Sequence, residues 1–407
     1  MTKQPAGAGP HMLRRINDAA VVAALRAADP GGASVAELAA ATGLSRPSVT
    51  RALNELRDRG LLAAAGTDGT GRGRPARRER FHSAAGLVAG VDIGPHKVLI
   101  LLADLAGRPI RTTRVPVPPQ CRGERLLALV EHSLNQALIG AGRSASELWA
   151  VSAGTPGIVD ESAGLVLRAA GIADWAPLPV AAHLRERLRC PVLLDNDVTL
   201  AVLAERDTPG GDANENLVLV HWGERIGAGI VIAGRPYRGS HGAAGELGFV
   251  DLMAPATGPV GEGRGAFERL VGAQALRRLA GAAYRRAGAE PPGQRANTLA
   301  ELFAAASGGD PVALDVVDQA ADRFTGGLAA LLLLLDPDRV VIGGGLSSAG
   351  PVLLDALRHR LDGRTLNPVR LQLSVLGDCG VALGAVRRAL ESVAARLTGM
   401  PDPAGTD

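Results

Sequence analysis

The chain has 407 residues, 46% of them hydrophobic and only 2% aromatic, with a formal net charge of +3. This length predicts two or three domains whose cores are filled by Ala, Leu and Val. The longest apolar run, residues 328–335, is too short to cross a bilayer, and three single cysteines, Cys121, Cys190 and Cys379, form no disulfide framework or zinc spacing. We therefore expect a cytoplasmic protein with no membrane partner.

Residues 34–59 carry two helix start signals eleven residues apart, a pattern typical of a helix-turn-helix. Ser34 and Glu37 match a capping box, Gly43 ends the first helix, and Ser45 caps the second. The second helix buries an apolar stripe and leaves outside a set of polar side chains that can bond phosphates and base edges. These candidate DNA-binding residues are Arg46, Ser48, Thr50, Arg51 and Asn54. The alternative is an ordinary helical hairpin with a solvated polar face.

Residues 71–80 contain five arginines on a glycine-flexible backbone, which favours a wing beside the helices. Arg72 and Arg74 are candidates to follow the negative potential of a minor groove. A basic interdomain linker is the alternative. Residues 1–82 hold 13 Lys and Arg against 7 Asp and Glu, a net charge of +6, whereas the remainder has 31 against 34, a net charge of −3. This asymmetry predicts a DNA-binding domain over residues 12–82, after a flexible N-terminus of residues 1–11.

After residue 86 the pattern changes to β runs broken by glycine. Residues 87–94 and 97–104 predict a hairpin, and residues 216–223 and 227–234 repeat the layout. Two such hairpins predict a duplicated α/β lobe with a cleft between the copies. The other expected elements are helices at 125–140, 179–188, 298–305, 310–335 and 381–397, strands at 148–152, 192–194 and 340–342, and an acidic turn at 195–197.

Glycine-rich motifs follow the predicted strands in a fixed order. They lie at residues 92–94, 154–160, 195–197, 223–229, 242–248 and 341–346. In this order, behind a winged helix, they resemble the ROK family of bacterial sugar-responsive repressors and sugar kinases, over roughly residues 12–395. The resemblance implies an α/β fold: an N-terminal winged helix-turn-helix followed by a two-lobed actin-like (ribonuclease H-like, hexokinase-type) domain. Its lobes would span residues 83–205 and 206–398, with the C-terminal helix packing on the first lobe and a flexible tail at 399–407.

The same resemblance implies a sugar site. The family's sugar-binding Asn and Asp fall on Asn196 and Asp197, its two glutamates on Glu246 and Glu268, and its glycine-proline turn on Pro156 and Gly157. In the kinases the position of Asp197 belongs to the general base. A carboxylate beside an amide can hold the vicinal hydroxyls of a sugar.

Two departures from the family pattern change the expected chemistry. Phe249 stands where the family has a zinc-binding His, and Pro259, Gly261 and Ala266 stand at its three cysteines, so we expect no zinc and no other metal. The same His orients the sugar in the family, so Phe249 also alters the sugar site.

The second departure lies in the two phosphate loops of the kinases. Pro95 and His96 replace a glycine and a hydroxyl residue in the first loop, and Glu224 and Arg225 replace a threonine and a glycine in the second. An unpaired Glu224 about 4 Å from a phosphate would repel it by roughly 4 kcal/mol, unless Arg225 pairs with it. We expect neither ATP binding nor any other cofactor, so Asp197 would be vestigial as a base.

The sequence thus predicts a transcriptional repressor, not an enzyme, acting as a homodimer or homotetramer. It would bind operator DNA and sense a sugar or sugar derivative without phosphorylating it. Lobe closure would reach the DNA-binding domain through a linker near residues 80–86. The alternatives are a ROK sugar kinase with an appended DNA-binding domain, and a ligand-independent regulator that uses the ROK domain as an oligomerisation scaffold.

Overall fold

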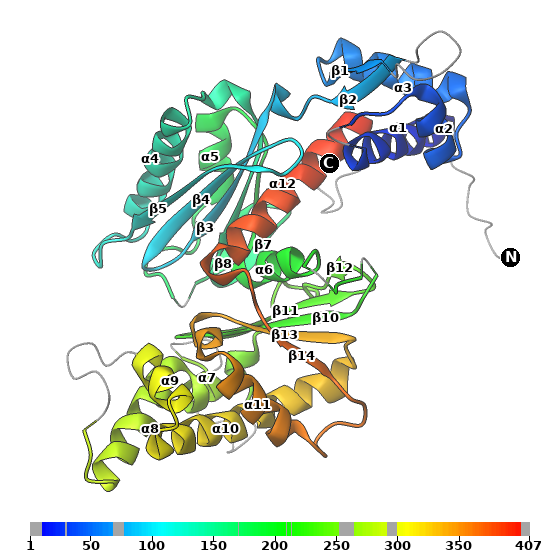
Figure 1. Ribbon diagram of the computed structural model, residues 1–407. Helices are drawn as coiled ribbons and strands as arrows, with labels where there is room; N and C mark the ends of the chain where they lie inside the picture. Colours follow the sequence, from blue (N-terminus) through cyan, green and yellow to red (C-terminus); the bar gives the residue numbers. More distant parts are fainter. Residues whose placement is uncertain are drawn as a thin grey trace, which may run out of the picture.

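The computed structural model describes residues 10–28, 31–67, 77–169, 171–208, 210–212, 214–251, 264–290 and 299–399. An N-terminal domain and two α/β lobes follow one another, and a long C-terminal helix packs against the first lobe and the N-terminal domain (Figure 1). None of the helices in these ranges combines the length and apolar character that crossing a bilayer requires.

The N-terminal domain is the predicted winged helix-turn-helix. It contains α1 (Pro10–Ala27), α2 (Val35–Thr42), α3 (Arg46–Asp58) and the antiparallel pair β1 (Leu62–Thr67) and β2 (Arg77–Phe81). The expected capping box is confirmed, because Glu37 N–H donates to Ser34 Oγ and Ser34 N–H donates to Glu37 Oε2. Gly43 ends α2 with φ of +69°. The sequence reasoning missed α1, which begins at Pro10, so residues 10 and 11 are helical and not part of a flexible terminus.

The first lobe is built on a five-stranded sheet in the order β5-β4-β3-β6-β9. Its strands are β3 (Leu87–Ile93), β4 (Lys97–Asp104), β5 (Pro109–Pro116), β6 (Leu148–Thr155) and β9 (Val192–Asn196). The lobe also holds α4 (Glu124–Gly140), α5 (Val180–Leu188), α6 (Asp197–Glu205) and the small hairpin of β7 (Ile158–Asp160) and β8 (Leu165–Arg168). The acidic turn expected at 195–197 is instead the end of β9 and the start of α6.

The second lobe repeats this sheet in the order β12-β11-β10-β13-β14. Its strands are β10 (Leu217–Trp222), β11 (Ile226–Ile232), β12 (Arg235–Pro236), β13 (Arg339–Gly343) and β14 (Arg370–Leu373), and its helices are α7 (Ala266–Val271), α8 (Ala273–Arg286), α9 (Leu299–Ser307), α10 (Pro311–Leu335) and α11 (Pro351–Leu361). In each sheet, the first, second and third strands of the order given pair antiparallel, and the third, fourth and fifth pair parallel. The predicted duplication is confirmed.

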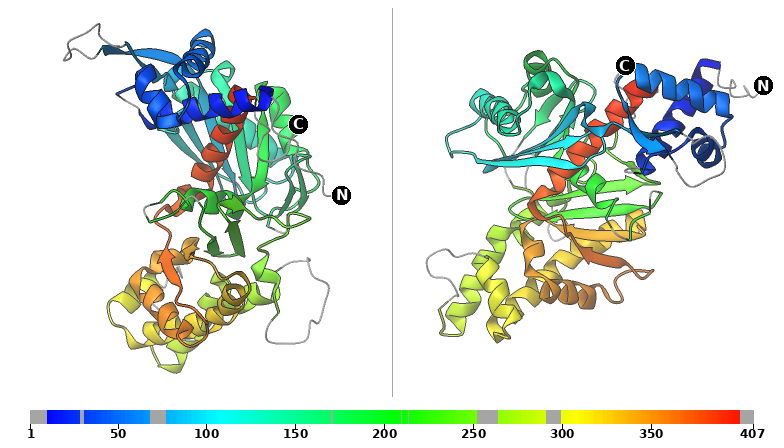
Figure 2. Two further views of the ribbon diagram at one scale, coloured as in Figure 1. Left: turned by 90° about the vertical axis from the view of Figure 1, so that its right-hand side faces the viewer. Right: turned by 45° about the horizontal axis from the view of Figure 1, so that its top comes forward.

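The last helix, α12 (Gly380–Thr398), leaves the second lobe after β14 and packs on β3 and β6 of the first lobe. Its C-terminal end lies against α1, as Figure 2 also shows. One apolar core joins the two, with Val22 and Leu56 of the N-terminal domain in the same cluster as Val393 and Leu397 of α12. The N-terminal domain therefore packs directly on the first lobe and α12, a contact that the linker-based prediction did not include.

Candidate functional site

The predicted DNA-binding side chains of α3 fall into two groups. Arg46, Thr50 and Asn54 are exposed. Ser48 is half-buried, with its Oγ 2.9 Å from Ser45 Oγ at the helix start. Arg51 lies 2.8 Å from Asp18 on α1 and 2.9 Å from Glu55, so it fastens α3 to α1. Of the predicted residues, Arg46, Thr50 and Asn54 therefore form the exposed set on α3.

The base of the wing is held by ion pairs. Glu79 of β2 is buried and lies 2.9 Å from Arg57 of α3 and 2.8 Å from Arg77. Arg78 lies 2.9 Å from Glu37 of α2. These contacts orient the strand pair against both helices. The predicted contacts of Arg72 and Arg74 lie outside the described residues.

In the first lobe, the residues expected to bind a sugar meet at the start of α6. Asn196 is the helix cap: its Oδ1 accepts from Val198 N–H at 2.9 Å and Thr199 N–H at 3.0 Å, and its Nδ2 donates to the Gly157 carbonyl at 2.9 Å. Gly157 has φ of +106°, and the carbonyl of Arg168 fills the space that a Cβ would need. The cap thus fixes the position of Asp197, and Pro156 precedes Gly157 at the end of β6.

The second lobe supplies the two glutamates. Glu268 of α7 is buried, accepts from Ile226 N–H at 3.4 Å, and lies 3.5 Å from Arg225. Burial raises the pKa of Glu246, and the charges of Asp197 and Glu268 raise it further while Arg225 opposes them. Helix α6, which begins with Asp197, packs on β10 and β11 of the second lobe, so Asp197 lies where the two lobes meet.

Sequence reasoning missed two basic side chains of this region, His221 and Lys97. Burial lowers the pKa of His221 on β10 and raises that of Asp197, and the attraction between the two opposes both shifts. Lys97 at the start of β4 lies 3.6 Å from Asp92 and 3.2 Å from Asp378, and burial raises the pKa of Asp92 to about 7. His221 was detectable as a polar side chain in the otherwise apolar run 217–222.

The second phosphate loop of the kinases corresponds here to a cluster of ion pairs. Glu224 lies 3.2 Å from Arg264 and 2.5 Å from Arg277. Burial acts to raise the pKa of Glu224, but the hydrogen bonds from Arg277 and Arg264 outweigh it and lower the pKa. The repulsion of roughly 4 kcal/mol expected for an unpaired Glu224 is therefore an overestimate, because two guanidinium groups compensate its charge. A phosphate would have to displace these pairs.

The residues present do not fit the structural zinc of the family. Phe249, which ends the short 3-10 helix Leu247–Phe249, and Ala266, which begins α7, have hydrocarbon side chains. Pro259 and Gly261 lie outside the described residues, and neither has a side-chain ligand atom. Within the described ranges, no group of three His, Cys, Asp or Glu could hold a metal ion.

A winged helix-turn-helix joined to a two-lobed α/β domain with duplicated sheets defines a protein of the actin-like class with an added nucleic-acid-binding module. Residues 88–391 match the ROK family and residues 15–73 match the MarR family. The chain belongs to the ROK family, and its N-terminal domain is a winged helix-turn-helix of MarR type.

Its relatives include kinases and regulators. A glucokinase from Halalkalibacterium halodurans is 29% identical over 72% of this chain and 92% of its own length. The DNA-binding transcriptional dual regulator NagC of Escherichia coli is 26% identical over 93% of this chain and 94% of its own length. A crystal structure of a ROK family transcriptional regulator, a homologue of the E. coli MLC protein, superposes with a TM-score of 0.79 at 22% identity, covering 96% of this chain and 99% of that one. The regulators thus match both domains of this chain.

Proposed function

We propose that this protein is a transcriptional repressor that binds operator DNA and whose ROK domain binds a sugar or sugar derivative without phosphorylating it. The observation that carries the proposal is the seating of the winged helix-turn-helix on α12 and the first lobe through a shared apolar core. A DNA-binding module attached in this way can respond to a ligand bound between the lobes. The similarity to NagC over nearly the whole chain supports a regulatory function.

The residues where the lobes meet suit a polyhydroxy ligand. Asp197, Glu246 and Glu268 offer carboxylate oxygens, and Asn196 holds Asp197 in place. Carboxylates accept hydrogen bonds from sugar hydroxyls, and burial strengthens such bonds. The similarity to a glucokinase supports a sugar as the ligand class.

The phosphate loops support binding without phosphoryl transfer. Glu224 is held by two arginines, Lys97 pairs with Asp92, and Pro95 lacks a backbone donor. A nucleotide would have to break these pairs before its phosphates could be held. We also infer that the protein folds without zinc, since Phe249 and Ala266 offer no ligand.

A homodimer or homotetramer would place two DNA-binding domains on one operator, and sugar binding would change their relative placement. A sugar kinase with an appended DNA-binding domain and a ligand-independent scaffold are the competing functions. They predict different outcomes in the same experiment.

The test combines three measurements on the full chain. An operator duplex is first selected from random DNA, then titrated with protein in the presence of hexoses, amino sugars and pentoses, while ADP release is followed with ATP added. We expect one sugar class to weaken operator binding at least tenfold without ADP release. Asp197→Ala should abolish this response, because a lost charged hydrogen bond costs about 1.5–3 kcal/mol, and should leave sugar-free binding unchanged. ADP release above background would identify a kinase, and no response to any sugar would favour the scaffold.

A further inference from the structure

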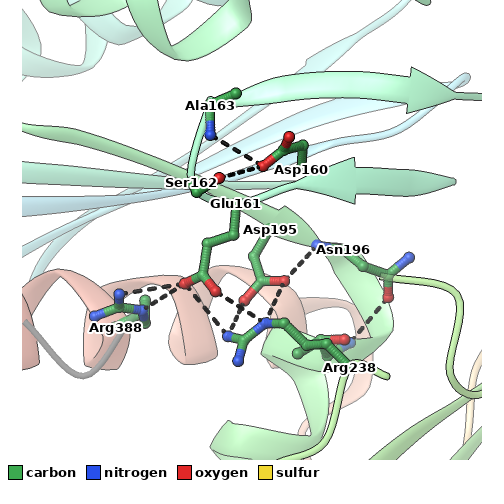
Figure 3. A network of polar contacts seen from close by, with 9 residues as sticks. Asp160, Glu161, Ser162, Ala163, Asp195, Asn196, Arg238 and Arg388 are labelled. Carbon is green, nitrogen blue, oxygen red and sulfur yellow. Dashed lines mark hydrogen bonds and ion pairs between the residues drawn. The ribbon is translucent and has the colours of Figure 1, made fainter. Parts of the chain in front are cut away.

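Four charged side chains, two buried and two half-buried, form a network beside the start of α6 (Figure 3). Arg238 lies 2.5 Å from Asp195 and 3.2 Å from Glu161. Arg388 lies 3.2 Å from the other oxygen of Glu161. The side chains of Asp195 and Arg388 are only 4% and 3% exposed, so these charges depend on one another for compensation.

The members of this network come from different parts of the molecule. Arg238 follows β12 of the second lobe, Asp195 ends β9 of the first lobe, and Glu161 lies in the turn between β7 and β8. Arg388 lies on α12. The network is therefore a charge-balanced link, two cations with two anions, between the second lobe, the first lobe and α12.

The network is also adjacent to the candidate sugar site. Asp195 directly precedes Asn196 and accepts a hydrogen bond from the Asn196 backbone N–H at 2.8 Å. A ligand that moves Asn196 or Asp197 must therefore act on Asp195 as well.

A second contact ties the sugar site to α12. The Cβ of any residue other than glycine at position 384 of α12 would lie 1.7 Å from the Leu200 carbonyl of α6. The two helix backbones thus touch without a side chain between them. Since α6 begins at Asp197, a shift of α6 is passed directly to α12.

The far end of α12 reaches the DNA-binding domain. Arg59, at the end of α3, donates to the Leu397 carbonyl at 2.7 Å. Arg26 of α1 donates to the Leu105 carbonyl of the first lobe at 2.7 Å. The position of α3 relative to the first lobe therefore depends on the position of α12.

We propose that Arg238, Asp195, Glu161 and Arg388 couple lobe closure to DNA binding, with α12 as the element that carries the movement from the sugar site to α3. This inference rests on the proposed function, since it takes Asn196 and Asp197 as ligand-binding residues. Arg238 is a positioning residue: when the lobes separate, it leaves the buried Asp195 and the half-buried Glu161 with Arg388 as the one remaining cation of the network. The unbalanced charge destabilises that arrangement, so lobe position and α12 position change together.

The test uses the full chain without any sugar. Arg238→Gln removes one cation of the network, and Arg235→Gln, an exposed arginine of β12, is the matched control. Hydrogen–deuterium exchange of α12 and α1 and affinity for the selected operator are measured in parallel. We expect Arg238→Gln to accelerate exchange in α12 and α1 at least fivefold and to weaken operator binding at least fivefold, because α3 loses its fixed seat. Arg238→Lys, which keeps the positive charge, should show exchange rates and operator affinity close to those of the unchanged protein. Arg235→Gln should change neither the exchange rates nor the operator affinity.

A charge-balanced variant guards against simple misfolding. Arg238→Gln combined with Asp195→Asn removes one cation and one anion, so its effects should be smaller than those of Arg238→Gln alone. The proposal is overturned if exchange accelerates only in residues 157–164 and 236–245, with α12, α1 and operator affinity unchanged, or if the balanced variant is as impaired as the single one. Because no sugar is added, this outcome is independent of whether a sugar is the ligand.

Discussion

At the scale of single residues, Asp92 gives the chain a pH-dependent stability. Burial raises the pKa of Asp92 to about 7, so the folded protein holds a proton that the unfolded chain releases near pH 4. This group therefore lowers stability progressively as the pH rises from about 4 to about 7. Asp92→Asn should raise the melting temperature at pH 8, by the equivalent of at least about 1.4 kcal/mol, and little at pH 4.

Melting curves of both proteins between pH 4 and pH 8 check this expectation. Glu186→Gln, at an exposed acid of α5, controls for the loss of one negative charge. A gain from Asp92→Asn that is equal at both ends of the pH range would contradict a buried titrating carboxyl.

Residue roles set by local chemistry were predictable, and those set by distant partners were not. The capping of α2 by Ser34 depends on Glu37, three residues away. The ion pair of Arg51 with Asp18 was not predicted, because Asp18 lies 33 residues away on a helix the sequence reasoning missed. The contact of Arg51 with DNA stays a prediction. Only Arg225 was considered as a partner of Glu224, because its actual partners Arg264 and Arg277 are remote in sequence.

At the scale of elements, the close packing of α12 on α6 depends on Gly384. An alanine there would place its Cβ 1.7 Å from the Leu200 carbonyl, so the helices must separate. We expect Gly384→Ala to destabilise the protein by about 1–3 kcal/mol and to weaken operator binding. Gly326→Ala is the matched control: this glycine of α10 has nothing within 4 Å of an added Cβ, and alanine there should stabilise by about 0.5–1 kcal/mol. Urea unfolding of both variants decides the point, and equal stabilities would refute the close contact.

The elements found from sequence were those with a strong periodic pattern. The buried strands β3 and β4 were predicted closely, because both are rich in apolar residues and a short turn separates them. Strand β5 was missed, since its side chains are almost all exposed and give no apolar signal. Helix α6 was hidden because it is short and largely buried, so an apolar run of that length does not distinguish a helix from a strand.

At the scale of the whole molecule, the family resemblance predicted more of the domain arrangement than the hydrophobic pattern of the sequence did. The duplicated lobes followed from two similar hairpins. The seating of α12 against α1 did not, because no local pattern shows which apolar faces of distant helices meet. The first lobe and the N-terminal domain are therefore connected in two ways: by the predicted linker near residues 80–86, and by the direct contact of Arg59 with Leu397 of α12.

The concentration of positive charge in the N-terminal domain has a measurable consequence for DNA binding. If each protomer neutralises ~3 phosphates, operator affinity of a dimer should fall with salt, with a slope of log K against log[salt] of about −5. Arg46→Ala removes an exposed cation of α3 from each protomer, so the slope should become shallower by about 2. Arg285→Ala, at an exposed arginine of α8 in the second lobe, should leave the slope unchanged. Operator titrations between 50 mM and 200 mM salt measure all three slopes. A slope near zero would show that the charge of this domain does not neutralise phosphates, and an equal change in both variants would show that the slope reports overall charge and not contacts of α3.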